Sequence, residues 1–71
     1  MIIVKGARVQ VFDDPIDCTR LEGVGTVTKV LRREPWNDAQ GRQIVRCNVR
    51  FPETMSHDRG VFERDVSRLA P

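Results

Sequence analysis

The chain has 71 residues, of which 39% are apolar and 31% charged, with a formal net charge of +2. This length predicts one domain, residues 1–71, and so short a chain buries too little surface to wall an active-site cleft on every side. The composition is that of a folded protein, and no apolar run approaches the ~20 residues that a bilayer requires, so no membrane partner is expected. Only four apolar residues precede Lys5, too few for a secretory signal, and a cytoplasmic location is expected.

The first two segments are predicted to be strands. Residues 1–4 are a short apolar run, which Lys5 and Gly6 interrupt. Residues 7–12 alternate between apolar and polar, which indicates a strand with Val9 and Val11 turned inward. Phe12 falls with the polar side chains in this alternation.

Residues 13–22 are expected to form a long irregular loop. Asp13 and Asp14 are typical of a capped turn, since their side chains accept hydrogen bonds from nearby backbone N–H groups. Ile16 and Leu21 are expected to pack this loop against the sheet, with residues 17–20 at its tip.

A second strand is predicted over residues 26–33. Gly23 and Gly25 at its entry indicate a bulge or a close approach of neighbouring backbone. The apolar residues of this segment do not keep one parity, so either a bulge shifts the register or the strand bends. Coiling of this kind closes small barrels.

The third strand has the clearest pattern. Residues 34–42 read as a hairpin loop, and the strand follows over residues 43–51, where Pro52 is expected to end pairing. Four residues fall on the inward face: Val45, Cys47, Val49 and Phe51. Four alternate with them on the outward face: Ile44, Arg46, Asn48 and Arg50.

The C-terminal part predicts a turn over residues 53–60 and a short strand over residues 61–64. Asp65 is typical of a cap for one turn of 3₁₀ helix, which would place Val66 and Leu69 inward. Residues 67–69 are then expected to close a barrel beside residues 2–4.

The order of these segments resembles the Src-homology-3-like small β-barrels, including KOW and Tudor-type modules. The resemblance covers nearly the whole chain: a short first strand, a long loop, a Gly-x-Gly-x-Val entry to the second strand, a regular third strand, and GVFERDVSRL at the end. It implies an all-β fold of five strands in a strongly bent barrel, with a 3₁₀ turn before the last strand. It also implies that loops and one sheet face bind peptides, RNA or other proteins.

A remote resemblance to the plasmid-encoded dihydrofolate reductases points to an enzyme on the same scaffold. Phe62, Glu63 and Arg64 stand where that family has Gln, Ile and Tyr. Because the residues that contact folate and nicotinamide are absent, this activity and its cofactor are not expected.

The charged residues are unevenly distributed. Lys and Arg against Asp and Glu number 4 and 4 over residues 1–31, 5 and 2 over 32–50, and 3 and 4 over 51–71. The central excess consists of arginines, whose planar fork suits phosphate and carboxylate groups. The predicted ligand-binding residues are Arg32, Arg33, Arg42, Arg46 and Arg50, together with Trp36; the alternative for the arginines is a solvated outer face.

Trp36 admits two interpretations. An exposed indole beside guanidinium groups can stack on a base or anchor a partner side chain. Alternatively, Trp36 folds back to plug one end of the barrel.

Three large apolar side chains share faces with polar residues in the predicted alternation: Phe12, Ile44 and Phe62. An outward patch of them would favour self-association, so a homo-oligomer, and a dimer first, is expected.

No catalytic or metal-binding pattern is present. His57 is interpreted as a solvated loop residue, and Cys47 as a small core residue. Cys18 and Cys47 lack metal-ligand spacing, and a disulfide between them is the less favoured alternative in a cytoplasmic protein. The sequence therefore predicts a non-enzymatic module, without cofactor or metal, that binds nucleic acid or an acidic protein. The alternatives are a structural homo-oligomer, or an enzyme with its site at an oligomer interface.

Overall fold

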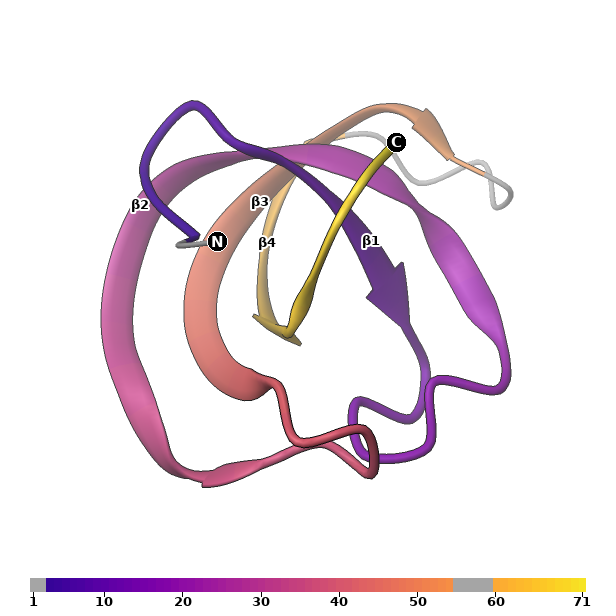
Figure 1. Cartoon of the computed structure of the whole chain (residues 1–71). Helices are drawn as coiled ribbons and strands as arrows, with labels where there is room; N and C mark the ends of the chain where they lie inside the picture. Colours follow the sequence, from indigo (N-terminus) through magenta and orange to yellow (C-terminus); the bar gives the residue numbers. More distant parts are fainter. Residues whose placement is uncertain (1–2, 55–59) are drawn as a thin grey trace.

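The computed structural model describes residues 3–54 and 60–71, which form one antiparallel sheet of five strands. The strands are β1 (Arg8–Phe12), β2 (Leu21–Asn37), β3 (Gln43–Thr54), β4 (Gly60–Val66) and β5 (Arg68–Leu69), in the order β4-β3-β2-β1-β5. Figure 1 shows β2 and β3 curving together as two long arcs around the C-terminal strands. The described residues contain no helix, so the predicted all-β class and strand number are confirmed.

The core lies on the concave side of this sheet. The four β3 side chains predicted to face inward are at most 2% exposed, and Val9 and Val11 of β1 join them, which confirms the alternation. Ile44 was predicted to face outward, and this is wrong. It is fully buried, although outside the main core cluster, directly after the loop of residues 38–42 on which residues 13–20 fold. Burying so large an apolar side chain is favourable on either face of a sheet.

Gly25 allows β2 and β3 to approach closely. A Cβ atom there would lie 2.4 Å from Val49 Cγ1 and 2.6 Å from the Arg50 carbonyl oxygen, so only glycine fits. The register of β2 against β3 shifts at four places, which bends β2 as its irregular apolar spacing indicated. With these bulges the strand is longer than predicted and continues through Trp36 to Asn37.

Two predicted strand ends are wrong. β3 continues past Pro52 to Thr54, because Pro52 lies at a register shift where the ladder does not need its missing N–H. β4 continues through Asp65 to Val66, so the described structure has no 3₁₀ turn there. Val66 is nevertheless buried, and Leu69 packs against the core, as predicted.

The C-terminal strand pairs with β1, where Val9 lies opposite Leu69, while the described residues 3 and 4 belong to no strand and Ile3 lines the same cavity as Leu69. β4 and β5 are the two edges of the sheet, and the described residues do not pair them with each other. Only Ser67 separates them in sequence, so the two edges approach each other at this residue. Residues 1–2, and residues 55–59 with His57 and much of the predicted turn, lie outside the described part of the chain.

The N-terminal segment is not a strand in the part that the structure describes. The Gly6 N–H donates to the Val27 carbonyl at 2.8 Å, and Ile3 is buried in the core cluster. No helix in the described residues has the length and apolar character needed to span a lipid bilayer.

Candidate anion-binding pocket

The pairing of β2 with β3 separates two neighbouring arginines. Arg33 lies opposite Val45, whose side chain is buried in the core, whereas Arg32 lies opposite Arg46 on the other face. Cross-strand partners share a face of the sheet. Arg33 therefore leaves the concave face at the open end of the core, and Arg32 leaves the convex face.

A cavity of about 670 Å³ opens where Arg33 emerges. Its apolar floor is formed by Ile3, Val45 and Leu69, which come from the N-terminal segment, β3 and β5. Five polar side chains surround this floor: Arg33, Arg42, Gln43, Ser67 and Arg68. We call these eight residues the basic pocket.

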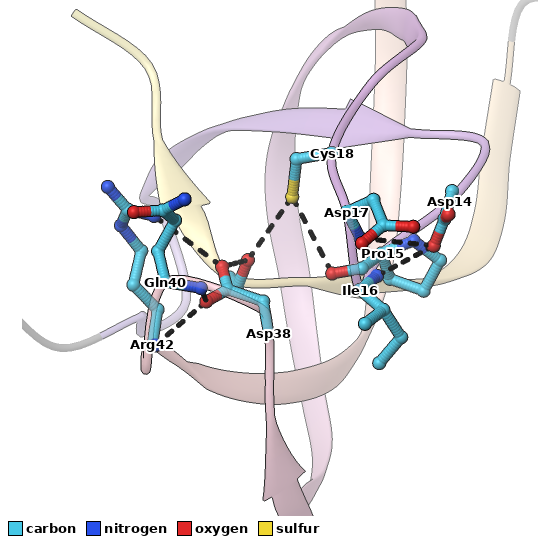
Figure 2. Close-up of polar contacts among 9 residues, drawn as sticks. Asp14, Pro15, Ile16, Asp17, Cys18, Asp38, Gln40 and Arg42 are labelled. Atoms are coloured by element: carbon cyan, nitrogen blue, oxygen red, sulfur yellow. Dashed lines mark hydrogen bonds and ion pairs between the residues drawn. The ribbon is translucent and has the colours of Figure 1, made fainter.

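Asp38 holds the rim of the basic pocket together. Its Oδ1 accepts hydrogen bonds from the backbone N–H groups of Gln40 and Arg42, each at 2.9 Å, and its Oδ2 accepts one from Ser67 Oγ at 2.7 Å (Figure 2). Burial acts to raise the pKa of Asp38, but these hydrogen bonds and the Arg42 charge outweigh it and hold the pKa below its ordinary value. The carboxylate therefore stays charged with its acceptor sites largely occupied.

The loop that holds Asp14 to Cys18 lies beside this rim (Figure 2). Asp14 Oδ1 accepts the N–H groups of Ile16 and Asp17, which confirms the predicted turn and lowers the pKa of Asp14. The Ile16 carbonyl accepts the Ala39 N–H at 2.8 Å, and Cys18 Sγ lies 3.9 Å from Ser67 Oγ. Backbone and polar contacts thus hold this loop in place.

Ile16 and Leu21 do not pack this loop against the sheet, so that prediction is wrong. Both side chains are exposed, at 42% and 37%. The hydrogen bond from the Ala39 N–H to the Ile16 carbonyl holds the loop through its backbone, and the Ile16 and Leu21 side chains stay exposed.

The three arginines of the basic pocket keep most of their donors available. Arg42 Nη1 is 3.7 Å from Asp38 Oδ2, beyond hydrogen-bond distance, and Arg33 Nη1 makes only a 3.5 Å contact with Gln43 Oε1. Arg68 lies against the Phe12 ring, with Cζ 5.4 Å from the ring centroid. Its buried Nε has no acceptor among the described residues. Of these three guanidinium groups, only that of Arg42 lies near a carboxylate in the described structure, and that carboxylate, Asp38, already accepts three hydrogen bonds.

On the convex face, Arg32 and Arg46 are neutralised. Arg32 Nε lies 2.8 Å from Glu34 Oε1, while Arg46 bonds Glu63 at 2.8 Å and lies 3.3 Å from Asp65. The hydrogen bond to Glu63 raises the pKa of Arg46 and lowers that of Glu63. Two guanidinium groups face three carboxylates here, and we call these five residues the outer cluster.

The remaining predicted contact residues lie apart from both groups. Arg50 is exposed on the convex face, opposite Thr26, which in turn lies opposite the exposed Arg8. Neither arginine makes an ion pair within residues 3–54 and 60–71. Trp36 is 50% exposed near the end of β2, so it does not fold back over the core, and it does not line the basic pocket.

Of the three residues predicted to form an oligomer patch, Ile44 is buried, whereas Phe12 and Phe62 are partly exposed, and self-association stays a prediction. Phe12 lies beneath the Arg68 guanidinium. Phe62 packs on Phe51 with ring centroids 6.1 Å apart, and Arg64 lies over both rings while it bonds Glu22. The hydrogen bonds from Arg64 lower the pKa of Glu22.

Sequence reasoning gave no binding role to seven residues of this site: Ile3, Asp38, Gln43, Val45, Ser67, Arg68 and Leu69. The carboxylate of Asp38, three residues before Gly41, was a readable signal for a side chain that caps its own loop. Nothing in the sequence placed Ser67 and Arg68 beside it, because that contact depends on β5 pairing with β1.

Both cysteines are free thiols, so the disulfide alternative is wrong. Cys47 is fully buried, and burial raises the pKa of its thiol to about 11. Among the described residues no three His, Cys, Asp or Glu side chains group as metal ligands would. Comparison with known proteins finds no family model, no curated protein and no solved structure that matches this chain.

Proposed function

We propose that this chain is a non-enzymatic binding module that holds an acidic partner at the basic pocket. One observation supports this most strongly: Arg33, Arg42 and Arg68 line one cavity with an apolar floor. Guanidinium groups form charge-assisted, bidentate hydrogen bonds with carboxylates and phosphates, and these are stronger than neutral ones. An acidic group in the cavity would meet the guanidinium groups of Arg33 and Arg42, with Arg68 also on the cavity wall.

An acidic protein segment fits the cavity better than a nucleic acid. A nucleic acid offers a row of phosphates and bases that stack on aromatic side chains, but Trp36 lies outside the basic pocket. A protein segment can bring one carboxylate together with an apolar side chain for the floor. The nucleic-acid alternative would instead use the exposed convex residues Arg8, Lys29 and Arg50.

We also propose that the fold is an open Src-homology-3-like barrel and that the protein is cytoplasmic. The sheet order β4-β3-β2-β1-β5 supports it, as does the single residue that joins the two edge strands. Two free cysteines are in keeping with a reducing compartment. In such barrels the open end and its loops are available for a partner.

The test uses two triple variants with equal charge. The pocket variant removes all three positive charges of the basic pocket through Arg33→Gln, Arg42→Gln and Arg68→Gln. The convex variant removes an equal number of positive charges from the convex face through Arg8→Gln, Lys29→Gln and Arg50→Gln. Each takes the formal net charge from +2 to −1, that is, 2 minus 3. The probes are a fluorescein-labelled peptide of Glu and Leu and a labelled single-stranded oligonucleotide, followed by anisotropy at low salt.

We expect the pocket variant to bind the peptide at least about tenfold more weakly, because each lost charge-assisted contact contributes about 1.5–3 kcal/mol before screening. The convex variant should bind within about threefold of the wild type. If both variants bind the peptide equally weakly, the net charge of the protein and not the basic pocket accounts for binding. Loss in the convex variant alone, with the oligonucleotide as the tighter probe, would favour nucleic acid instead.

A further inference from the structure

The basic pocket combines two features that a site for bare anions does not need. Its donors surround a floor of three aliphatic side chains: Ile3, Val45 and Leu69. An inorganic anion or a sugar–phosphate backbone gains nothing from such a floor, whereas an aliphatic group gains by displacing water from it. The cavity of about 670 Å³ is also within the range of about 300–1,000 Å³ in which small organic groups bind.

The polar groups are arranged to meet an acceptor that carries no donor of its own. Arg33 and Arg42 have weakly engaged N–H groups, whereas the Arg68 Nε is buried and its guanidinium lies over the Phe12 ring. A carboxylate oxygen supplies an acceptor for the N–H groups of Arg33 and Arg42. The Ser67 hydroxyl already donates its hydrogen to Asp38, so it has no hydrogen left to donate to a bound anion.

We infer that the ligand of the basic pocket is an amphipathic carboxylate, one carboxylate group attached to an aliphatic body the size of a leucine side chain. This inference rests on the proposed function and narrows it. Two sources offer this chemistry: the C-terminal residue of a partner chain, and a free branched-chain organic acid. In both, the carboxylate lies among the guanidinium groups and the aliphatic body covers the floor.

The experiment is an NMR titration of the ¹⁵N-labelled full chain with a matched ligand series. The peptide acetyl-Gly-Ser-Gly-Leu is compared with its C-terminal amide, which removes the charge, and with acetyl-Gly-Ser-Gly-Gly, which removes the aliphatic body. Free 4-methylpentanoate, acetate and inorganic phosphate complete the series. Leu69 also packs against the core, so a substitution there could unfold the chain. The titration therefore uses the wild-type chain and varies only the ligand.

The leucine peptide or 4-methylpentanoate should shift the signals of Ile3, Val45, Leu69 and the pocket arginines. Removing the charge or the aliphatic body should weaken binding about tenfold or more. If the leucine peptide binds more tightly than 4-methylpentanoate, the ligand is the C-terminal residue of a partner chain. If 4-methylpentanoate binds more tightly, the ligand is a small organic acid. If acetate or phosphate binds as well as the leucine peptide, amphipathic selectivity is wrong while the proposed function stands. If no anion shifts pocket signals and the charge-matched variants bind the labelled peptide alike, the proposed function fails as well.

Discussion

The outer cluster and the basic pocket use the same side chain for opposite purposes. In the outer cluster, Arg32 and Arg46 meet three carboxylates, two of them from β4. In the basic pocket, Arg42 alone of the three arginines lies near a carboxylate in the described structure, that of Asp38, whose oxygens already accept three hydrogen bonds. The arginines of the outer cluster thus join strands, and those of the pocket remain available to a ligand.

The difference arises from one step along the chain. Arg32 and Arg33 are neighbours, yet strand alternation sends them to opposite faces, where Arg46 and Val45 are their cross-strand partners. Arg46 in turn lies opposite Asp65 of β4. The arginines of residues 32–50 therefore fall in three places: Arg33 and Arg42 at the basic pocket, Arg32 and Arg46 in the neutralised outer cluster, and Arg50 exposed on the convex face.

The largest expected effect removes the strand geometry on which both regions depend. Gly25→Ala should lower the free energy of unfolding by about 3 kcal/mol or more, because its Cβ would overlap the Arg50 carbonyl and Val49. The control is Gly41→Ala, at a φ of 81° but with nothing within 4 Å, which should cost about 1 kcal/mol. Urea unfolding measures both, and equal losses would mean that the close approach of β2 and β3 is unimportant.

Next in size is the rim of the pocket. Asp38→Ala removes the acceptor of two backbone N–H groups and of the Ser67 hydroxyl, so stability should fall by about 2–3 kcal/mol. Ser67→Ala removes one of these bonds and should cost about 1 kcal/mol. Comparable losses for the two variants would show that the loop keeps its shape without the carboxylate.

Two single arginine variants test whether the outer cluster contributes more to stability than the basic pocket does. Arg46→Gln should cost about 1–2 kcal/mol, since it leaves Glu63 and Asp65 without their shared cation in a partly buried position. Arg33→Gln should change stability by less than about 0.5 kcal/mol, because this side chain makes no close ion pair in the described structure. The opposite ranking in urea unfolding would exchange the roles of the two regions.

The smallest effect is one of pH. Glu63 has a pKa below its ordinary value of 4.5, chiefly through the hydrogen bond from Arg46. A lowered folded-state pKa means that its contribution is complete above pH 4.5 and disappears as the pH falls through the folded-state value. Glu63→Gln should therefore be less stable than the wild type at pH 7, by less than Arg46→Gln. Unfolding curves of the two proteins should converge in acid, and a gap that persists there would exclude the ion pair as its cause.

The local patterns were enough to predict the strands, because alternation and glycine placement act over a few residues. Val45 to Phe51 and the close approach at Gly25 are confirmed in detail. The strand ends were not predictable, since Pro52 and Asp65 are tolerated only by a register set through pairing with β2 and β3.

The candidate site was predicted in part. Arg33 and Arg42 belong to the basic pocket, but Arg68 joins them through the pairing of β5 with β1, a contact between residues more than fifty positions apart. Arg32 and Arg46 were assigned to the same surface because sequence shows where charges lie along the chain and not which carboxylates lie across the sheet.

The most direct measurement is an NMR titration of the arginine Nε–Hε signals with the acidic peptide of Glu and Leu. The signals of Arg33, Arg42 and Arg68 should shift together and saturate at one dissociation constant, while those of Arg32 and Arg46 stay in place, held by their carboxylates. Shifts confined to Arg32 and Arg46, or spread evenly over every arginine, would contradict the division between a pocket that binds and a cluster that stabilises.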